Sequence, residues 1–215
     1  MIISRGRRYI FVHIPKTGGT SLSLALEDRA MKDDILVGDT PKATQRRRRL
    51  KTLTASGRLW KHSGLRDIAG VLSDEEIEAF FVVTLVRNPW DRMVSYYHWL
   101  REQNWDHAAV SLAKSSVFSD FLKHADTQRV IKAANYASYV TDRHGVKQCD
   151  LYVKLEELDQ DLTPFEQHLG FSLGKVGQIN RSNRDPDYRV YYDDQTAEAV
   201  AQFCASDIKR FGYSF

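Results

Sequence analysis

The hydrophobic positions of this 215-residue chain form two patterns, short continuous runs and longer stretches with helical spacing. The continuous runs lie at residues 9–14, 80–86 and 151–153, and their β-branched and aromatic side chains predict strands that are buried on both faces. Stretches with apolar side chains three or four residues apart follow these runs and predict amphipathic helices. Buried strands that alternate with helices predict a three-layer α/β domain with a mostly parallel central sheet.

The length of the chain fits one domain, because domains commonly hold roughly 100–200 residues. We therefore expect a single domain over residues 1–215, with the polar, irregular segment at about 33–58 as a mobile insertion. No apolar run approaches the ~20 residues of a membrane helix, and the run at 9–14 lacks the small-residue cleavage site of a signal peptide. Cys149 and Cys204 are too few for a disulfide framework or a zinc site. These features predict a cytoplasmic protein with no membrane span and no metal.

The segment at 33–58 carries most of the excess positive charge. The net charge of the chain is only +3, yet a run of basic residues without any acidic one lies between positions 42 and 51. The run consists of Lys42, Arg46, Arg47, Arg48, Arg49 and Lys51. It is either a solvated loop or a docking patch for an anionic acceptor or cofactor. Nucleic-acid binding is disfavoured, because basic residues elsewhere are interleaved with acidic ones and no aromatic ladder accompanies the run.

The segment after the first apolar run combines glycine with groups that bind anions. It reads Pro15-Lys16-Thr17-Gly18-Gly19-Thr20-Ser21. Two glycines allow positive φ and a close approach of the backbone, and the helix that follows presents its first amides and the positive end of its dipole to a ligand. Lys16 adds a full positive charge, and three hydroxyl groups add donors. This turn predicts a site for a phosphate-like anion.

The second apolar run ends in a cation, Arg87. Asn88 and Pro89 begin a helix there, and Ser95 lies about two turns into it. Because α/β sheets bind ligands beyond the carboxyl ends of their strands, Arg87 predicts a second anion site. The pattern differs from the GxxxxGK[ST] loop of nucleotide hydrolases, because Lys16 precedes the glycines and no apolar strand ends in an aspartate that would hold Mg²⁺.

These two segments resemble the donor-binding motifs of the sulfotransferases. The 5′-phosphosulfate loop of that family is similar to Ile14-Pro15-Lys16-Thr17-Gly18-Gly19-Thr20-Ser21, and its 3′-phosphate motif is similar to Arg87-Asn88-Pro89-Trp90-Asp91-Arg92-Met93-Val94-Ser95-Tyr96-Tyr97. The resemblance covers most of the chain and is closest to the carbohydrate-type branch, which includes heparan sulfate 2-O-sulfotransferases and many small bacterial proteins. It implies a P-loop, nucleotide-kinase-like fold and 3′-phosphoadenosine 5′-phosphosulfate (PAPS) as the sulfuryl donor.

The family resemblance also implies a role for each matching residue. The residues expected to hold the 5′-phosphate are Lys16, Thr17, Gly18, Gly19, Thr20 and Ser21. Lys16 is further expected to act in catalysis by neutralising charge on the bridging oxygen as the S–O bond breaks. Arg87 and Ser95 are expected to bind the 3′-phosphate. Residues 180–184 lie where the family often has a late donor-binding segment, but they give no residue-by-residue match.

One of the seven histidines is the expected general base. His62 lies between the two anion motifs, in Trp60-Lys61-His62-Ser63-Gly64-Leu65-Arg66-Asp67, and matches the segment that supplies the base in the carbohydrate-type branch. An imidazole near its ordinary pKa is suited to take a hydroxyl proton at neutral pH. His13 and Asp67 are the next candidates, and Lys61 is either a residue that orients the acceptor or a surface lysine.

The sequence therefore predicts a sulfotransferase that transfers a sulfuryl group in line to an acceptor hydroxyl, without a metal. The branch resemblance favours a carbohydrate acceptor, and the basic run favours an acidic one. Two alternatives are a nucleotide kinase or hydrolase of the same fold class, and a non-enzymatic adaptor that binds an anionic polymer through the basic run. The sequence does not predict the acceptor's identity, the oligomeric state or the residues that contact the adenine.

Overall fold

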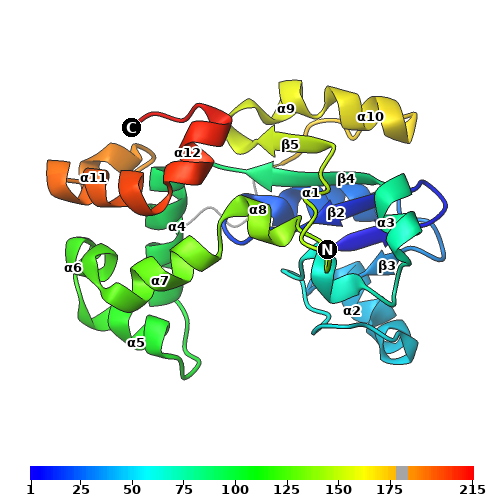
Figure 1. The fold of residues 1–215 in the computed structure, drawn as a ribbon, viewed down its shortest axis with the longest axis horizontal. Coiled ribbons are helices and arrows are strands. Elements are labelled where there is room, and N and C mark those ends of the chain that lie inside the picture. The colour runs from blue at the N-terminus through cyan, green and yellow to red at the C-terminus, as the bar shows by residue number, and fades with distance from the viewer. Residues whose placement is uncertain (178–183) are drawn as a thin grey trace. The chain divides into compact units, whose positions relative to one another are not determined.

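The computed structural model describes residues 1–177 and 184–215. The described chain divides into two compact units. The first unit contains Met1–Val86 and the segment that begins at Tyr136, and the second contains Arg87–Asn135 and the C-terminal segment (Figure 1). The expected single domain over residues 1–215 stays a prediction.

A five-stranded sheet forms the centre of the described part of the first unit, in the order β3-β1-β2-β4-β5. The strands are β1 (Ile2–Ser4), β2 (Tyr9–Val12), β3 (Ile35–Leu36), β4 (Phe81–Val86) and β5 (Leu151–Lys154). β2, β4 and β5 run parallel, whereas β1 pairs antiparallel with β2 and β3. The predicted α/β architecture is confirmed. The whole sheet is mixed, and the three predicted strands form its parallel core.

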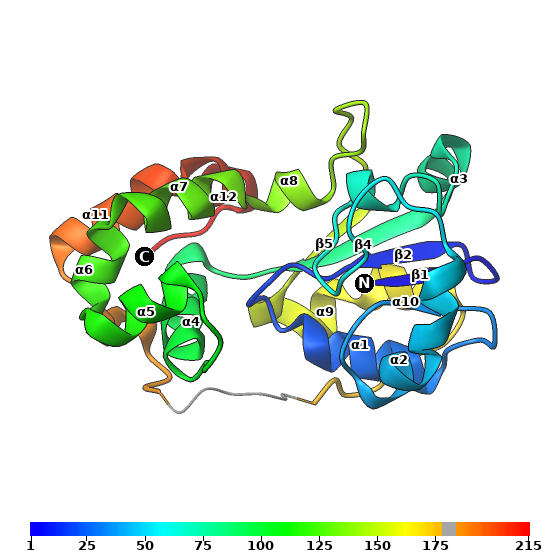
Figure 2. The same ribbon diagram turned by 90° about the horizontal axis from the view of Figure 1, so that it is seen from below.

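Helices cover both faces of this sheet. They are α1 (Gly19–Asp28), α2 (Pro41–Arg46), α3 (Asp74–Ala79), α8 (Tyr136–Tyr139), α9 (Leu158–Asp161) and α10 (Thr163–Leu169), with short 3₁₀ helices η1 (Arg47–Thr52), η2 (Leu65–Ile68) and η3 (Leu155–Glu157). Leu22 of α1 and Phe165 of α10 pack in one core cluster with Phe11 and Val83 of the sheet. Figure 2 shows α3 and α8 on the opposite side of the sheet from α1 and α10. The predicted three-layer arrangement is therefore present in this unit.

The segment at 33–58 is more regular than the sequence predicted. It contains β3, α2 and η1 in place of an irregular chain. Thr40 caps α2, since its hydroxyl accepts the Ala43 amide hydrogen at 3.3 Å, and Pro41 occupies the first turn. Thr40 also donates to the Glu27 carboxylate at 2.7 Å, which ties the segment to the end of α1. The expectation of an irregular chain was wrong here, and the mobility of the segment stays a prediction.

The described part of the second unit is helical. Its elements are α4 (Pro89–Arg101), α5 (Ala108–Ser115), α6 (Phe118–Lys123), α7 (Ala125–Ala133), η4 (Tyr188–Tyr191), α11 (Asp194–Phe203) and α12 (Ala205–Phe211). Met93 and Tyr97 of α4 pack in one cluster with Phe121 of α6 and Phe203 of α11. Asn88 caps α4 as predicted, because its side chain accepts the Trp90 amide hydrogen at 3.0 Å.

Membrane-spanning and metal-binding features were also sought in residues 1–177 and 184–215. None of the helices described there has the length and apolar character needed to cross a membrane. In the same residues, no group of three or more His, Cys, Asp and Glu side chains is placed to hold a metal ion.

Candidate functional site

The loop between β2 and α1 is held in an unusual backbone conformation. Lys16 has φ +66°, a left-handed value that costs a side-chain-bearing residue roughly 1–2 kcal/mol, and Gly18 has φ +83°. Thr17 is fully buried, and its hydroxyl donates to the Ile14 carbonyl oxygen at 2.9 Å. This hydroxyl therefore fixes the shape of the loop. Strain of this kind at an ordered turn is typical of ligand-binding sites.

Both glycines of the loop lie too close to neighbouring side chains to be replaced. A Cβ atom on Gly18 would lie 2.6 Å from Leu155 Cδ1, and one on Gly19 would lie 2.3 Å from His13 Cδ2. Gly18 is also the N-cap residue of α1 and has no side chain to satisfy the amides of the first turn. These amides are the groups that bind phosphate at helix N-termini. The loop and Lys16 thus offer the donor set of an anion site.

His62 lies next to the residue that packs on this loop. Its Nδ1 donates to the backbone carbonyl oxygen of His13 at 2.8 Å, and the two rings meet edge to face with centroids 4.8 Å apart. Because a carbonyl oxygen only accepts hydrogen bonds, Nδ1 carries the proton and Nε2 bears the lone pair. Burial lowers the pKa of His62 to about 4, so that the ring is neutral at pH 7. The expectation of an ordinary pKa was wrong, because it did not include the burial of the ring. The tautomer and the neutral charge state still suit a proton acceptor.

The alternative bases have structural surroundings. The His13 side chain is buried, and burial holds its pKa well below the ordinary value. The Asp67 carboxylate accepts the Gly64 amide hydrogen at 2.7 Å, which closes the turn before η2. Lys61, the neighbour of His62, forms an ion pair with Asp39 at 2.6 Å. Of the candidate bases in this unit, His62 is the one that combines a bound Nδ1 proton with partial exposure.

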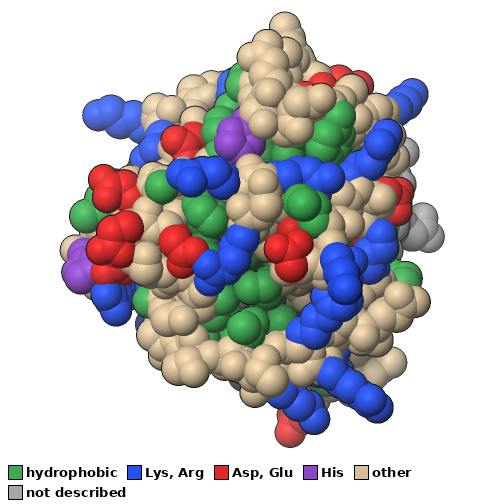
Figure 3. Space-filling model, turned by 90° about the vertical axis from the view of Figure 1, so that its right-hand side faces the viewer, with side chains coloured by type: hydrophobic (Ala, Val, Ile, Leu, Met, Phe, Trp, Pro, Cys, Tyr) green, Lys and Arg blue, Asp and Glu red, His purple; other side chains and the backbone are tan. Residues whose placement is uncertain are grey.

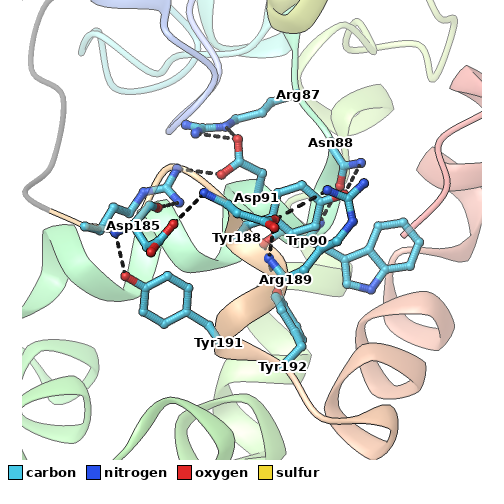
Figure 4. Close-up of polar contacts among 11 residues, drawn as sticks. Arg87, Asn88, Trp90, Asp91, Asp185, Tyr188, Arg189, Tyr191 and Tyr192 are labelled. Carbon is cyan, nitrogen blue, oxygen red and sulfur yellow. Dashed lines mark hydrogen bonds and ion pairs between the residues drawn. The ribbon is translucent and has the colours of Figure 1, made fainter.

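In the second unit, Arg87 is one of two guanidinium groups that share a carboxylate. Arg87 Nε and one terminal nitrogen lie 2.7 and 2.6 Å from Asp91 Oδ2 (Figure 4). Arg184 contacts Asp91 Oδ1 at 2.5 Å. The Arg87 and Arg184 side chains are only 14% and 9% exposed. Two positive charges against one negative charge leave a net charge of +1 on rigidly held donors. Such a cluster is suited to bind a phosphate group.

The chain after Arg184 holds the start of α4, where Arg87 is located. The Asn88 side-chain amide donates to the Tyr188 hydroxyl at 3.2 Å, and the Tyr192 hydroxyl donates to the Trp90 carbonyl oxygen at 2.8 Å (Figure 4). Ser95, the second residue predicted at the 3′-phosphate, is buried two turns further along α4.

Sequence analysis did not predict the parts played by Asp91 and Arg184. Arg184 belongs to the segment at 180–184, whose other residues lie outside the described chain. The only signal for its partner was the spacing of Arg87 and Asp91, which are four residues apart at the start of a helix.

Comparisons with known proteins concern the family and the fold of the chain. A family model described as the sulfotransferase family matches residues 1–214. The crystal structure of mouse sulfotransferase SULT7A1 complexed with PAP is similar to this chain with a TM-score of 0.57, at 14% sequence identity, over 96% of this chain and 86% of that one. No curated protein gives a significant match. The predicted P-loop, nucleotide-kinase-like fold is confirmed by the structural likeness, and the family match carries the enzyme class and its sulfuryl donor. The chain belongs to the sulfotransferase family, and it is an enzyme that uses PAPS as its co-substrate.

Proposed function

We propose that this sulfotransferase transfers the sulfuryl group to a hydroxyl of a carbohydrate, with His62 as the general base. The observation that carries the proposal is the hydrogen bond from His62 Nδ1 to the His13 carbonyl oxygen at 2.8 Å. That bond fixes the tautomer, and the His13 ring packs directly on Gly19 of the phosphosulfate loop. A proton acceptor is thus held beside the loop that the family uses for the 5′ end of its donor.

The residues of both units fit the chemistry of PAPS. In the first unit, Lys16, the backbone of Thr17, Gly18 and Gly19, and the backbone and hydroxyl groups of Thr20 and Ser21 would hold the 5′-phosphate. The Thr17 hydroxyl would act indirectly, because it donates to the Ile14 carbonyl oxygen and so shapes the loop. In the second unit, Arg87 and Ser95 would hold the 3′-phosphate, and we add Arg184 to this group because it shares Asp91 with Arg87. Each charge-assisted hydrogen bond to a phosphate is worth roughly 1.5–3 kcal/mol.

The proposed reaction moves one proton and one sulfuryl group. PAPS supplies the sulfuryl group and leaves as 3′,5′-adenosine bisphosphate (PAP), taking the electrons of the broken S–O bond. His62 Nε2 accepts the proton of the acceptor hydroxyl as the oxygen bonds to sulfur. Lys16 neutralises the negative charge that grows on the departing phosphate oxygen. The hydrogen bond of the Thr17 hydroxyl to Ile14 and the packing of Leu155 and His13 against the glycines hold the loop in shape before the donor binds.

The carbohydrate acceptor is supported by the resemblance to the carbohydrate-type branch. A panel of sugar, phenol and lipid-linked hydroxyl compounds, supplied with labelled PAPS, identifies the acceptor class directly. We expect labelled sulfate on the sugars. Transfer to phenols alone would contradict the carbohydrate assignment and leave the sulfotransferase chemistry intact.

The role of His62 is tested with the acceptor found in that panel. We expect His62→Ala to lower kcat by roughly 10²–10⁴-fold and to leave the affinity for PAP nearly unchanged, because a general base acts on the acceptor. His144→Ala, which removes an exposed histidine that contacts Asp74, is the matched control and should keep full activity. Retention of most activity by His62→Ala, or loss of folding, would remove His62 from the mechanism.

A further inference from the structure

An exposed indole ring lies beside the proposed base. The Trp60 side chain is one of the large exposed hydrophobic groups, with 43% of its surface accessible. Its ring centroid lies 5.0 Å from that of His62, at an interplanar angle of 86°. The Arg58 guanidinium lies 5.8 Å from the same ring centroid. Trp60 therefore presents a large apolar surface next to the group proposed to take the acceptor proton.

The backbone under this ring is well anchored. Ser63 is fully buried, and its hydroxyl accepts the Trp60 amide hydrogen at 2.9 Å and donates to the Arg58 carbonyl oxygen at 2.8 Å. A single exposed aromatic residue usually needs no explanation. Trp60 differs because a tightly hydrogen-bonded turn holds it against His62. A rigid aromatic face at this position is suited to pack against the apolar face of a sugar ring.

A basic depression begins at the residue before Trp60. Leu59 lines an open depression of about 580 Å³ together with residues of the basic run and its helix. The other lining residues are Thr44, Arg47, Arg48, Leu50 and Lys51. No acidic side chain is among these lining residues of the described chain. Figure 3 shows Lys and Arg side chains crowded at the lower right of this face of the molecule, beside hydrophobic ones.

The structure separates the basic run into two groups. The first group is used within the fold, since Lys42 donates to the Glu27 carbonyl oxygen, Arg46 to that of Met31 and Arg49 to that of Lys32.

The second group consists of the three cations that line the depression, Arg47, Arg48 and Lys51. Their side chains are exposed and form no hydrogen bond or ion pair with any residue that the structure describes. Three exposed cations in a depression that Leu50 and Leu59 also line attract an anionic ligand.

We propose that Trp60 and this basic depression form the acceptor-binding surface, and that the acceptor is an oligosaccharide with carboxylate or sulfate groups. The proposal rests on the proposed function, because it places one sugar on Trp60 with a hydroxyl at His62. Leu59, which lines the depression, directly precedes Trp60 in the chain, so the proposal requires an acceptor of several sugars that extends from the indole ring to the three cations. A single aromatic ring does not form the stacking ladder typical of single-stranded nucleic acids, which favours a saccharide.

Binding of defined oligosaccharides to the full chain tests this proposal without turnover. The acidic probes are a galacturonate hexamer and a heparin hexasaccharide, and the neutral probe is maltohexaose, each titrated in the presence of PAP. We expect an acidic probe to bind and its affinity to fall with salt, because exposed charges are screened beyond about 10 Å at 0.1 M. Maltohexaose should bind at least about tenfold more weakly, a difference of ~1.4 kcal/mol.

Replacement of Arg47, Arg48 and Lys51 by serine tests the basic depression. We expect the triple variant to lose about tenfold or more in affinity for the acidic probe and to show a weaker salt dependence, since each lost ionic contact reduces the salt slope by about one. The matched control replaces Lys132, Lys147 and Lys175 by serine, which removes the same charge from exposed positions elsewhere. This control should keep the affinity of the parent protein.

Trp60→Ala tests the aromatic platform. We expect about a tenfold loss of affinity for the acidic probe, with most of it restored in Trp60→Phe, and an unchanged affinity for PAP. Trp105→Ala, which removes another exposed indole, is the control.

The outcomes separate this proposal from the proposed function. Failure of both acidic probes to bind, equal binding of maltohexaose, or an equal loss in the control variants would overturn the acceptor surface. Tighter binding of a single-stranded oligonucleotide of the same charge would also overturn it, and would make the depression a nucleic-acid site. Failure of PAP to bind would instead overturn the proposed function, while the saccharide titrations would still decide the surface.

Discussion

Replacement of Gly19 by alanine tests whether the phosphosulfate loop and the proposed base, His62, contact each other through the His13 ring. The new Cβ would lie 2.3 Å from His13 Cδ2 and 2.6 Å from its Nε2, whereas ordinary contact begins at 3.4 Å. The His13 ring must therefore retreat by about 1.1 Å, the difference between 3.4 and 2.3 Å. It has little room to do so, because it is buried between Phe11, on which it stacks at 5.9 Å, and His62.

The expected cost follows from this geometry. Overpacking of a close-packed site costs typically 1–3 kcal/mol, and a weakened hydrogen bond from His62 to the His13 carbonyl oxygen adds roughly 1 kcal/mol. We expect Gly19→Ala to lower the free energy of unfolding by about 2–4 kcal/mol in urea titrations and to reduce turnover more strongly than PAP affinity. Gly177→Ala is the control, because a Cβ there meets nothing within 4 Å. Equal stability of the two variants would refute the proposed contact between loop and base.

Three further predictions concern the donor groups and the pH dependence of stability. In urea titrations, Lys16→Gly should be about 1 kcal/mol more stable than Lys16→Ala, because only glycine adopts the left-handed conformation without strain. Both variants should lose turnover. Equal stability of the two variants would refute the strain at this position. Arg87→Ala and Arg184→Ala should each weaken PAP binding by about 2–3 kcal/mol. The double variant should lose less binding free energy than the sum of the two losses, because both guanidinium groups contact the same aspartate. Strictly additive losses in calorimetry would contradict this coupling. Burial lowers the pKa values of His13 and His62 below that of an unfolded histidine, so the free energy of unfolding should be highest above pH 6.5. It should fall as the pH drops from 6.5 to 5, by up to ~1.4 kcal/mol per pH unit for each histidine. An unchanged dependence of the free energy of unfolding on pH in the His62→Asn variant would contradict the contribution of His62.

The strands of the parallel core were predictable because each is a continuous apolar run. β1 and β3 were not, because they contain only three and two residues and leave no period to detect. They form because β1 pairs with β2 on one side and with β3 on the other, and these pairings supply hydrogen-bond partners for the backbone groups of both segments. The helix α2 was missed for a different reason. Ala43 is the one buried residue of α2, so the helix has no apolar periodicity that could be detected in the sequence. Thr40 and Pro41 do match the residue preferences of a helix N-terminus.

The candidate site was predictable where its chemistry is local in the chain. Glycines, a lysine and hydroxyls in one turn predict an anion loop from seven consecutive residues. The ion pair of Arg184 with Asp91 joins positions 93 apart, and only the folded chain brings them together. The same is true of the hydrogen bond between His62 and His13, which are 49 positions apart. The roles of these residues in the reaction stay predictions.

The division of the basic run also depended on the fold. The sequence shows six cations, and either a solvated loop or a docking patch fits that pattern. Backbone carbonyl oxygens of residues 27–34 accept hydrogen bonds from three of the cations. The partners are 15 to 17 positions apart, so no local sequence pattern predicts these contacts. Only the remaining three carry the proposal of an acidic acceptor.

Calorimetry of nucleotide binding tests the account most directly. We expect PAP to bind tightly in buffer with EDTA and without Mg²⁺, because its phosphates are assigned to protein amides, Lys16 and two guanidinium groups. ATP lacks the 3′-phosphate, and the loss of two charge-assisted contacts worth at least ~1.5 kcal/mol each predicts an affinity at least about a hundredfold weaker. Equal affinity for PAP and ATP, or PAP binding that requires Mg²⁺, would contradict the assignment of these residues to a PAPS site.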